Sequence, residues 1–228
     1  MPSHVLVVAA HPDDEVLGCG GTIARLAGEG AEVRILILAD GETSRPAAAG
    51  AGKRHAIEQR NEAAEKACKV LGCAAVEVLT LPDNRLDGVE LLDVVQRIEK
   101  AIEKHKPERV FTHHSGDVNI DHRVVHDAVI AACRPVPGHP VRELFFFEVP
   151  SSTEWRPPGS AASFHPNCYF DIGATLHKKR EALQAYASEL REFPHPRSLE
   201  GVEALARWRG ATVGVAAAEA FVLGRAVL

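Results

Sequence analysis

Residues 5–21 read VLVVAAHPDDEVLGCGG, and this stretch decides the expected fold. A run of small and β-branched apolar residues, typical of a strand buried in a sheet, stops at His11. A proline, three consecutive acids and glycines follow it, and a helical pattern covers 20–28. Desolvating that much charge at the end of a buried strand is costly, so these side chains need partners. The stretch therefore predicts a strand, a turn with a chemical role, and a helix.

The alternation of apolar strand and helical pattern continues to about residue 150. Strands are expected at 4–10, 32–39, 76–81, 109–113 and 143–149, and helices at 20–28, 53–71, 91–105 and 123–133. Strict alternation predicts an α/β fold with a mostly parallel sheet and helices on both of its faces. Binding residues in such sheets lie at the carboxyl ends of the strands, so we expect the site there.

The sequence changes character after residue 150. Residues 150–167 are rich in Ser, Pro and Gly and predict an ordered, irregular loop. Helices are then expected at 175–190 and 199–218. The length suits one domain over residues 1–228, with residues 1–150 as the α/β core and residues 151–228 as a substrate-side extension.

Composition narrows the class of protein. The net charge of −5 argues against a nucleic-acid binder and favours small-molecule partners. Five dispersed cysteines without a CxxC pair are not typical of a disulfide framework. We find no signal peptide and no run of about 18 apolar residues that would span a bilayer. We expect a cytoplasmic protein that contacts neither nucleic acid nor membrane, and the formation of a homo-oligomer stays open.

Two segments at expected strand ends concentrate histidine and acid: HPDDE at 11–15 and HHSGDVNIDH at 113–122. Imidazole and carboxylate are ligands that Zn²⁺ takes at catalytic sites, usually three of them with one position left for water. His11 and Asp14 are three residues apart across a turn, close enough to chelate one ion, and His122 is a candidate third ligand. A further carboxylate beside them accepts a proton from the water.

The HPDD motif alone has a second explanation, which is capping of the following helix. Asp in a first helical turn satisfies free N–H groups and interacts favourably with the helix dipole. Two motifs rich in His and Asp, both at expected strand ends, favour a metal site over a simple cap.

The pair AAHPDDEVLGCGGTIARL (9–26) and HHSGDVNIDHRVVHDA (113–128) resembles the PIG-L/LmbE-like family of zinc-dependent N-acetylglucosaminyl deacetylases. The resemblance covers nearly the whole chain, including FPHPRS at 193–198. It implies a Rossmann-like fold and one Zn²⁺ per chain, or another divalent metal. It also implies hydrolysis of the N-acetyl group of an N-acetylglucosamine-type amino sugar or its conjugate, which releases acetate and a free amine.

By resemblance, His11, Asp14 and His122 are the zinc ligands, and Asp13 is the general base. Many family members have a histidine three residues before the last ligand, where it steadies the oxyanion or protonates the leaving amine. This chain has Asn119 there, and an amide donates a hydrogen bond but does not act as an acid.

Because Asn119 is not an acid, the proton for the leaving amine has two other expected sources. Either Asp13 passes its captured proton to the amine, or another group protonates it, for which His195 in FPHPRS is the candidate.

Four further residues have expected roles, each with a plainer alternative. Asp83 resembles a family acid that binds sugar hydroxyls, or serves a turn. Arg60 resembles a family arginine near the substrate, or lies on a solvated helix face. Arg197 suits an anionic group such as a diphosphate, or forms a surface ion pair. Asp121 orients a ligand imidazole, or caps the following helix.

Three other classes of protein fit less well. A dinucleotide-dependent oxidoreductase needs GxGxxG, but AHPDDEVLGCGG puts acids where a pyrophosphate lies. A serine hydrolase needs a GxSxG elbow, which is absent from the sequence. A non-enzymatic zinc module favours four closing ligands rich in Cys.

Within the favoured class of zinc hydrolases, the alternative is a zinc amidohydrolase for another N-acyl substrate, such as an antibiotic or thiol-conjugate intermediate.

Overall fold

The apolar run near the N-terminus forms β1 (His4–Ala9), whose side chains are almost all buried. The structure, a computed structural model, describes residues 3–44 and 51–228. β1 pairs in parallel with β2 (Glu32–Ala39) on one side and β4 (Arg109–His113) on the other. Because β1 has neighbours on both sides, the residues that follow it lie in the middle of the carboxyl edge of the sheet.

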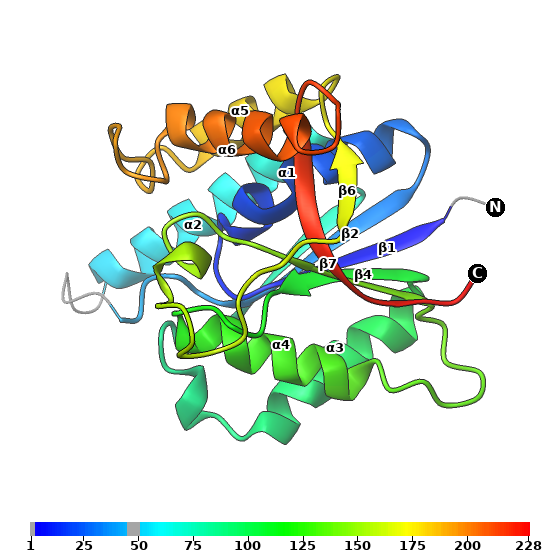
Figure 1. Cartoon of the computed structure of the whole chain (residues 1–228). Coiled ribbons are helices and arrows are strands. Elements are labelled where there is room, and N and C mark those ends of the chain that lie inside the picture. Colours follow the sequence, from blue (N-terminus) through cyan, green and yellow to red (C-terminus); the bar gives the residue numbers. More distant parts are fainter. Residues whose placement is uncertain (1–2, 45–50) are drawn as a thin grey trace.

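Seven strands of the described residues form one mixed sheet in the order β3-β2-β1-β4-β5-β7-β6 (Figure 1). β3 (Ala75–Leu81) and β5 (Glu143–Phe147) continue the parallel part. β7 (Ala218–Ala226) runs antiparallel to β5 and to β6 (Cys168–Asp171). The predicted α/β fold with a mostly parallel sheet is confirmed, and two strands beyond residue 150 extend that sheet.

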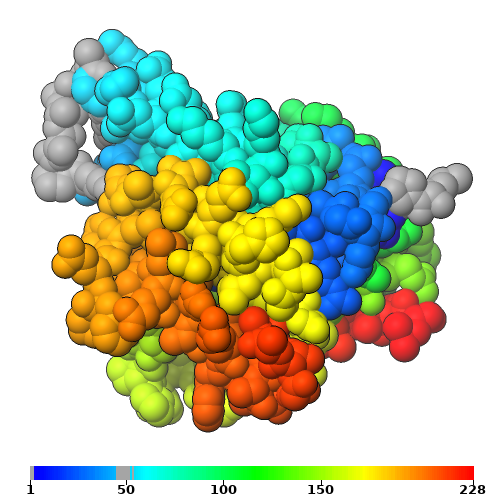
Figure 2. Space-filling view, turned by 90° about the horizontal axis from the view of Figure 1, so that it is seen from above, coloured from blue at the N-terminus to red at the C-terminus, as the bar shows by residue number. Residues whose placement is uncertain are grey.

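Helices cover both faces of the sheet, as predicted (Figure 1). One face carries α1 (Asp14–Gly28), α2 (Ala51–Leu71), α5 (Leu176–Ala185) and α6 (Leu199–Ala211), and the other carries α3 (Leu91–His105) and α4 (Ile120–Ala132). Figure 2 shows α5, in yellow, between α2 in cyan and α6 in orange. Successive β1 side chains enter two separate cores, Val7 with α1 and Val8 with α3 and α4.

The predicted start of the first helix is wrong. α1 begins at Asp14 and not at residue 20. Cys19 has non-helical backbone angles (φ −145°, ψ 23°), which interrupt α1 one turn after its start. The periodicity that predicted a helix at 20–28 therefore describes only the part of α1 beyond this break.

The predicted ends of the last two helices are also wrong. The helix expected at 175–190 ends at Ala185 in α5. The helix expected at 199–218 ends at Ala211, because Ala218 instead begins β7. The apolar start of β7 is buried between β5 and β6, a long-range pairing that overrides its local helical pattern. Among residues 3–44 and 51–228, no helix combines the length and the apolar character needed to cross a membrane.

Candidate metal centre and catalytic pocket

The turn between β1 and α1 is built around Asp13. Its backbone is left-handed (φ 115°, ψ −26°), and its side chain makes no capping hydrogen bond to α1. A non-glycine residue in this conformation is strained, which surrounding contacts must offset. The Asp13 N–H donates to Glu15 Oε2 at 3.1 Å, and the Tyr186 hydroxyl donates to Glu15 Oε1 at 2.6 Å. Buried Glu15 therefore fixes the turn and leaves the Asp13 carboxylate for other partners.

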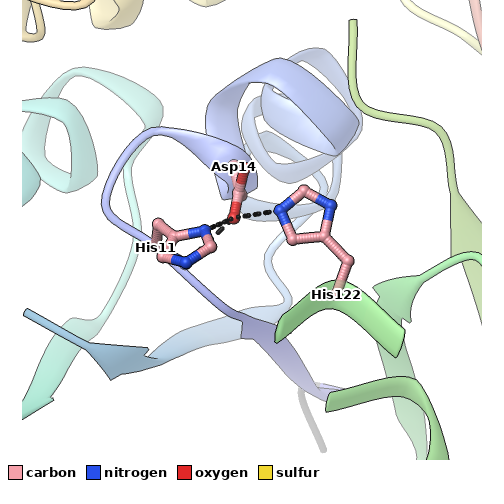
Figure 3. A group of neighbouring side chains, drawn as sticks. All are labelled: His11, Asp14 and His122. Atoms are coloured by element: carbon pink, nitrogen blue, oxygen red, sulfur yellow. Dashed lines mark hydrogen bonds and ion pairs between the residues drawn. The ribbon is translucent and has the colours of Figure 1, made fainter. Parts of the chain in front are cut away.

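The three predicted metal ligands lie together at the end of β1 (Figure 3). Asp14 Oδ2 is 3.1 Å from His11 Nδ1 and 3.2 Å from His122 Nε2, which comes from the first turn of α4. A tetrahedral zinc ion with bonds of about 2.0–2.1 Å holds its ligand atoms roughly 3.3 Å apart. The two separations from Asp14 match this spacing, and all three ligand atoms lie within 4.8 Å of one another, so the three side chains can share one ion.

The buried Asp14 Oδ1 has no hydrogen-bond partner among the described residues, and the buried His122 Nε2 has only Asp14 Oδ2 beside it, at 3.2 Å. Buried polar atoms without partners are rare because leaving them unsatisfied is costly. A divalent ion would satisfy them, and two imidazoles with one carboxylate are a donor set typical of zinc. The residues present therefore fit a metal ion.

The acidic side chains around His11 and His122 stabilise the protonated, positively charged form of both rings. Burial lowers the pKa of His11, but hydrogen bonds to Asp121 and Asp14 outweigh it and raise that pKa to about 10. Burial likewise lowers the pKa of His122, whereas Asp14 and Asp117 raise it to about 9. Burial raises the pKa of Asp14, but the two histidines hold it well below its usual range. The cluster thus holds protons that a metal ion would displace.

Asp121 and Asp83 hold the far side of the His11 ring. Asp121 Oδ2 lies 3.0 Å from His11 Nε2, and Asp83 Oδ1 lies 3.3 Å from the same nitrogen. Asp121 also accepts two backbone N–H groups from the loop after β3. Asn119, and not Asp121, is the N-cap of α4, since its side chain accepts the Asp121 N–H at 2.8 Å. The geometry therefore favours orientation of His11 by Asp121 over the capping alternative.

Two residues that touch His122 were not assigned from the sequence. Asp117 Oδ2 lies 3.2 Å from His122 Nδ1. His113 stacks on the His122 ring with centroids 4.0 Å apart, and its Nε2 accepts the Ala10 N–H at 2.8 Å. The sequence did offer a signal for Asp117, since it is an acid five residues before His122. The position of His113 depends on the pairing of β4 with β1, which the motif alone does not show.

A polar pocket opens above this cluster. Its described lining consists of His11, Pro12, Asp13, Gly41, Ser44, Arg60, Asp83, Asn84, Asn119, Glu189 and Arg197. Six predicted site residues are among them, and Asp14, His122 and Asp121 are buried close by. His195 is missing from the described lining. Its ring packs against Trp155 with centroids 5.8 Å apart, and its Nδ1 accepts the Arg197 N–H at 3.1 Å.

The C-terminal segment brings a cation to Asp13. Arg197 Nη1 donates to Asp13 Oδ2 at 3.1 Å, and Arg197 Nε donates to Ser151 Oγ at 2.7 Å. Burial raises the pKa of Asp13 to about 7, although Arg197 acts in the opposite direction. Arg197 is therefore a partly buried ion-pair partner of Asp13 in the pocket lining, and the alternative of a surface ion pair is wrong. The contact forms within one chain, without a second subunit.

Arg60 is also enclosed by acids. It is buried, and its Nε donates to Glu42 Oε1 at 2.8 Å while its Nη2 donates to Glu189 Oε1. The alternative of a solvated helix face is therefore wrong for Arg60. Glu189 was not assigned from the sequence, because it lies 129 residues from Arg60 and belongs to no motif.

Comparison with known proteins decides the family. The family model described as PIG-L, GlcNAc-PI de-N-acetylase, matches residues 6–133, which are more than half of the chain and contain both motifs. The chain belongs to the PIG-L family. This confirms the resemblance seen in the sequence.

Relatives in this family are named as deacetylases. The uncharacterized deacetylase YaiS of Escherichia coli (strain K12) is 31% identical over 65% of this chain and 75% of its own length. A probable N-acetyl-alpha-D-glucosaminyl L-malate deacetylase 2 of Bacillus cereus is 27% identical over 83% of this chain and 84% of its own. Both names support the predicted hydrolase class for this PIG-L protein.

Solved structures share the fold. The conserved protein TT1542 of Thermus thermophilus has a TM-score of 0.76 and 31% identity, over 98% of this chain and 96% of that chain. GalB, the 4-carboxy-2-hydroxymuconate hydratase of Pseudomonas putida KT2440, has a TM-score of 0.78 at 21% identity, over 99% and 98%. The second likeness shows the fold alone, because the reaction of a protein depends on the residues of its site and not on its fold.

Proposed function

We propose that this PIG-L protein is a zinc-dependent deacetylase that removes the N-acetyl group from an N-acetylglucosamine-type amino sugar or its conjugate. The observation that carries the proposal is that Asp13 lines the pocket together with His11 and directly precedes Asp14 of the His11, Asp14 and His122 cluster. A carboxylate that titrates near neutral pH next to a metal centre suits proton transfer from water during amide hydrolysis.

The chemistry divides between a metal ion and the residues of the chain. An ion held by the cluster supplies a Lewis acid for the acetamide carbonyl and lowers the pKa of water. Asp13 accepts a proton as the water oxygen bonds to the carbonyl carbon, and Arg197 holds the Asp13 carboxylate in place. The C–N bond then breaks, leaving acetate and the amine.

Asn119 is suited to steady the oxyanion. Its Oδ1 is used by the α4 cap, and its Nδ2 donates to Asn84 Oδ1 at 3.0 Å. The amide nitrogen carries a second hydrogen, which is available for a substrate oxygen.

The proton for the leaving amine needs another source, because Asn119 supplies none and His195 lies outside the described pocket lining. We assign this step to Asp13, which returns the proton taken from water.

The polar lining supports a hydroxyl-rich substrate. Pro12 and Gly41 are the only described lining residues without a polar side chain. Asp83 and Asn84 offer acceptors and donors near His11, as recognition of a sugar ring requires. Arg197 donates through Nε and Nη1 to Ser151 and Asp13, so its first role in the proposal is to hold Asp13.

The test is a panel assay on metal-depleted protein with and without added zinc. Substrates are N-acetylglucosamine, a neutral N-acetylated disaccharide, a nucleotide sugar, a thiol-conjugate precursor and an N-acetylated antibiotic intermediate. We expect acetate and free amine in equal amounts from the sugars, restored by zinc. Zinc binding without amine release from any substrate would support a non-enzymatic module. Release from the antibiotic or thiol-conjugate substrate alone would favour the alternative amidohydrolase.

A further inference from the structure

The turn after β5 holds three buried hydroxyl residues. Ser151 and Ser152 lie between β5 and a short 3-10 helix, η2 (Thr153–Trp155), and Thr153 is the first residue of η2. These three residues are called here the Ser151–Thr153 turn. None of them lines the described pocket, yet all three contact charged side chains that do touch the site. The turn therefore lies between two parts of the catalytic machinery.

One arm of the turn fixes Asp117. Thr153 Oγ1 donates to Asp117 Oδ2 at 2.6 Å, and Ser152 Oγ donates to Asp117 Oδ1. Thr153 Oγ1 also accepts the Val149 N–H at 2.8 Å, so its single hydrogen is directed at the carboxylate. Asp117 in turn faces His122 Nδ1 at 3.2 Å. A carboxylate on Nδ1 leaves Nε2 of the imidazole for a metal ion.

The other arm fixes Arg197. Ser151 Oγ accepts from Arg197 Nε at 2.7 Å, and the same guanidinium donates to Asp13 Oδ2 at 3.1 Å. Ser151 has a left-handed backbone (φ 65°), and Glu154 accepts the N–H groups of Ser151 at 2.6 Å and Ser152 at 3.2 Å. A strained non-glycine residue held in place by a neighbouring carboxylate is a feature often found at functional sites.

We propose that the Ser151–Thr153 turn is a positioning element that aims His122 through Asp117 and Asp13 through Arg197. The hydroxyls of Ser152 and Thr153 contact Asp117, which touches His122. The hydroxyl of Ser151 contacts Arg197, which touches Asp13. The Asp13 arm rests on the proposed function, whereas the His122 arm concerns zinc binding alone. The two arms therefore have separable effects on the protein.

The His122 arm is tested by zinc affinity, measured in competition with a chromophoric chelator. Thr153→Val keeps the side-chain shape but removes the hydroxyl, and we expect it to weaken zinc binding by about 10–100-fold. Thr153→Ser restores the hydroxyl and should restore the affinity. Ser152→Ala, which removes the other donor to Asp117, should also weaken zinc and replaces Thr153→Val if that variant does not fold. Folded variants that bind zinc as tightly as the wild type would overturn the proposal.

The Asp13 arm is tested by kinetics with the substrate found active in the panel. We expect Ser151→Ala to lower kcat on the order of 10-fold, with KM and zinc affinity unchanged. Ser151→Gly relieves the left-handed backbone but also lacks the hydroxyl, so it should show the same loss. Wild-type kcat in both variants, or a zinc defect like that of Thr153→Val, would overturn the proposal. A wild-type chain that releases no acetate would refute the proposed function, and Thr153→Val would still decide the positioning role.

Discussion

Asp13 and Asp14, the adjacent acids of HPDD, have different charged partners. The metal side of the site is Asp14 with His11 and His122, and the base side is Asp13 with Arg197. On the metal side, Asp14 is enclosed by His11 and His122, which hold its pKa well below the usual range despite burial. On the base side, burial raises the pKa of Asp13 to about 7, and its cationic partner is Arg197 from the C-terminal segment. Neighbouring carboxylates thus acquire different chemistry from their partners.

Removing an imidazole from the metal side is expected to have the largest effect. His122→Ala should weaken zinc binding by about 10³-fold or more, because the ligands share a total binding free energy of roughly 10–16 kcal/mol. Deacetylation should be lost with the metal. Metal content after dialysis against a chelator measures this, with the exposed His55→Ala as the control. A fully loaded His122→Ala protein would remove His122 from the metal side.

Proton competition should make zinc binding to the metal side depend on pH. The pKa values of about 10 for His11 and about 9 for His122 mean that both rings are protonated near neutral pH in the metal-free chain. Zinc must displace both protons, so its apparent affinity should rise with pH, by up to about 100-fold per pH unit, until the pH passes about 9. Affinities at several pH values and proton release in weak buffer measure this. An affinity that does not change with pH would contradict the protonated cluster.

A smaller effect is expected on the base side. In Arg197→Gln, burial acts on Asp13 without the opposing guanidinium, so the pKa of Asp13 rises further. The acid limb of the kcat/KM profile should move to higher pH, and kcat near pH 7 should fall by about 10–100-fold. Zinc affinity should not change. Arg191→Gln is the matched control, because Arg191 is an exposed arginine of the same segment that contacts only backbone carbonyls in the described residues. Equal profiles for both variants would separate Arg197 from Asp13.

The clustering of His11, Asp14 and His122 could be predicted because its determinants are short-range. His11 and Asp14 lie in one turn after an apolar run, and His122 lies in a second motif after another strand. Parallel strands place their carboxyl ends at the same edge, so two local patterns suffice to bring three ligands together. The same rule explains why the α/β fold followed from the alternation of elements in residues 1–150.

The contacts that surround Asp13 could not be predicted, because they depend on pairings between residues far apart in the sequence. Arg197 lies 184 residues from Asp13, and the Tyr186 hydroxyl that holds Glu15 lies 171 residues away from it. Glu219 lies just beyond the last predicted helix, at 199–218, and the structure places it in β7. Its carboxylate accepts the N–H groups of Gly21 and Thr22, which follow the break in α1. No local periodicity reports such contacts, since they form only after the sheet is complete.

The division of labour between the two adjacent acids is tested most directly by measuring zinc content and acetate release together in Asp13→Asn and Asp14→Asn. We expect Asp13→Asn to keep one zinc per chain and lose about 10²–10⁴-fold in kcat, as removal of a general base does. Asp14→Asn should lose zinc and activity together. Near-normal turnover in Asp13→Asn, or loss of zinc from it equal to that in Asp14→Asn, would contradict the separation of base and ligand.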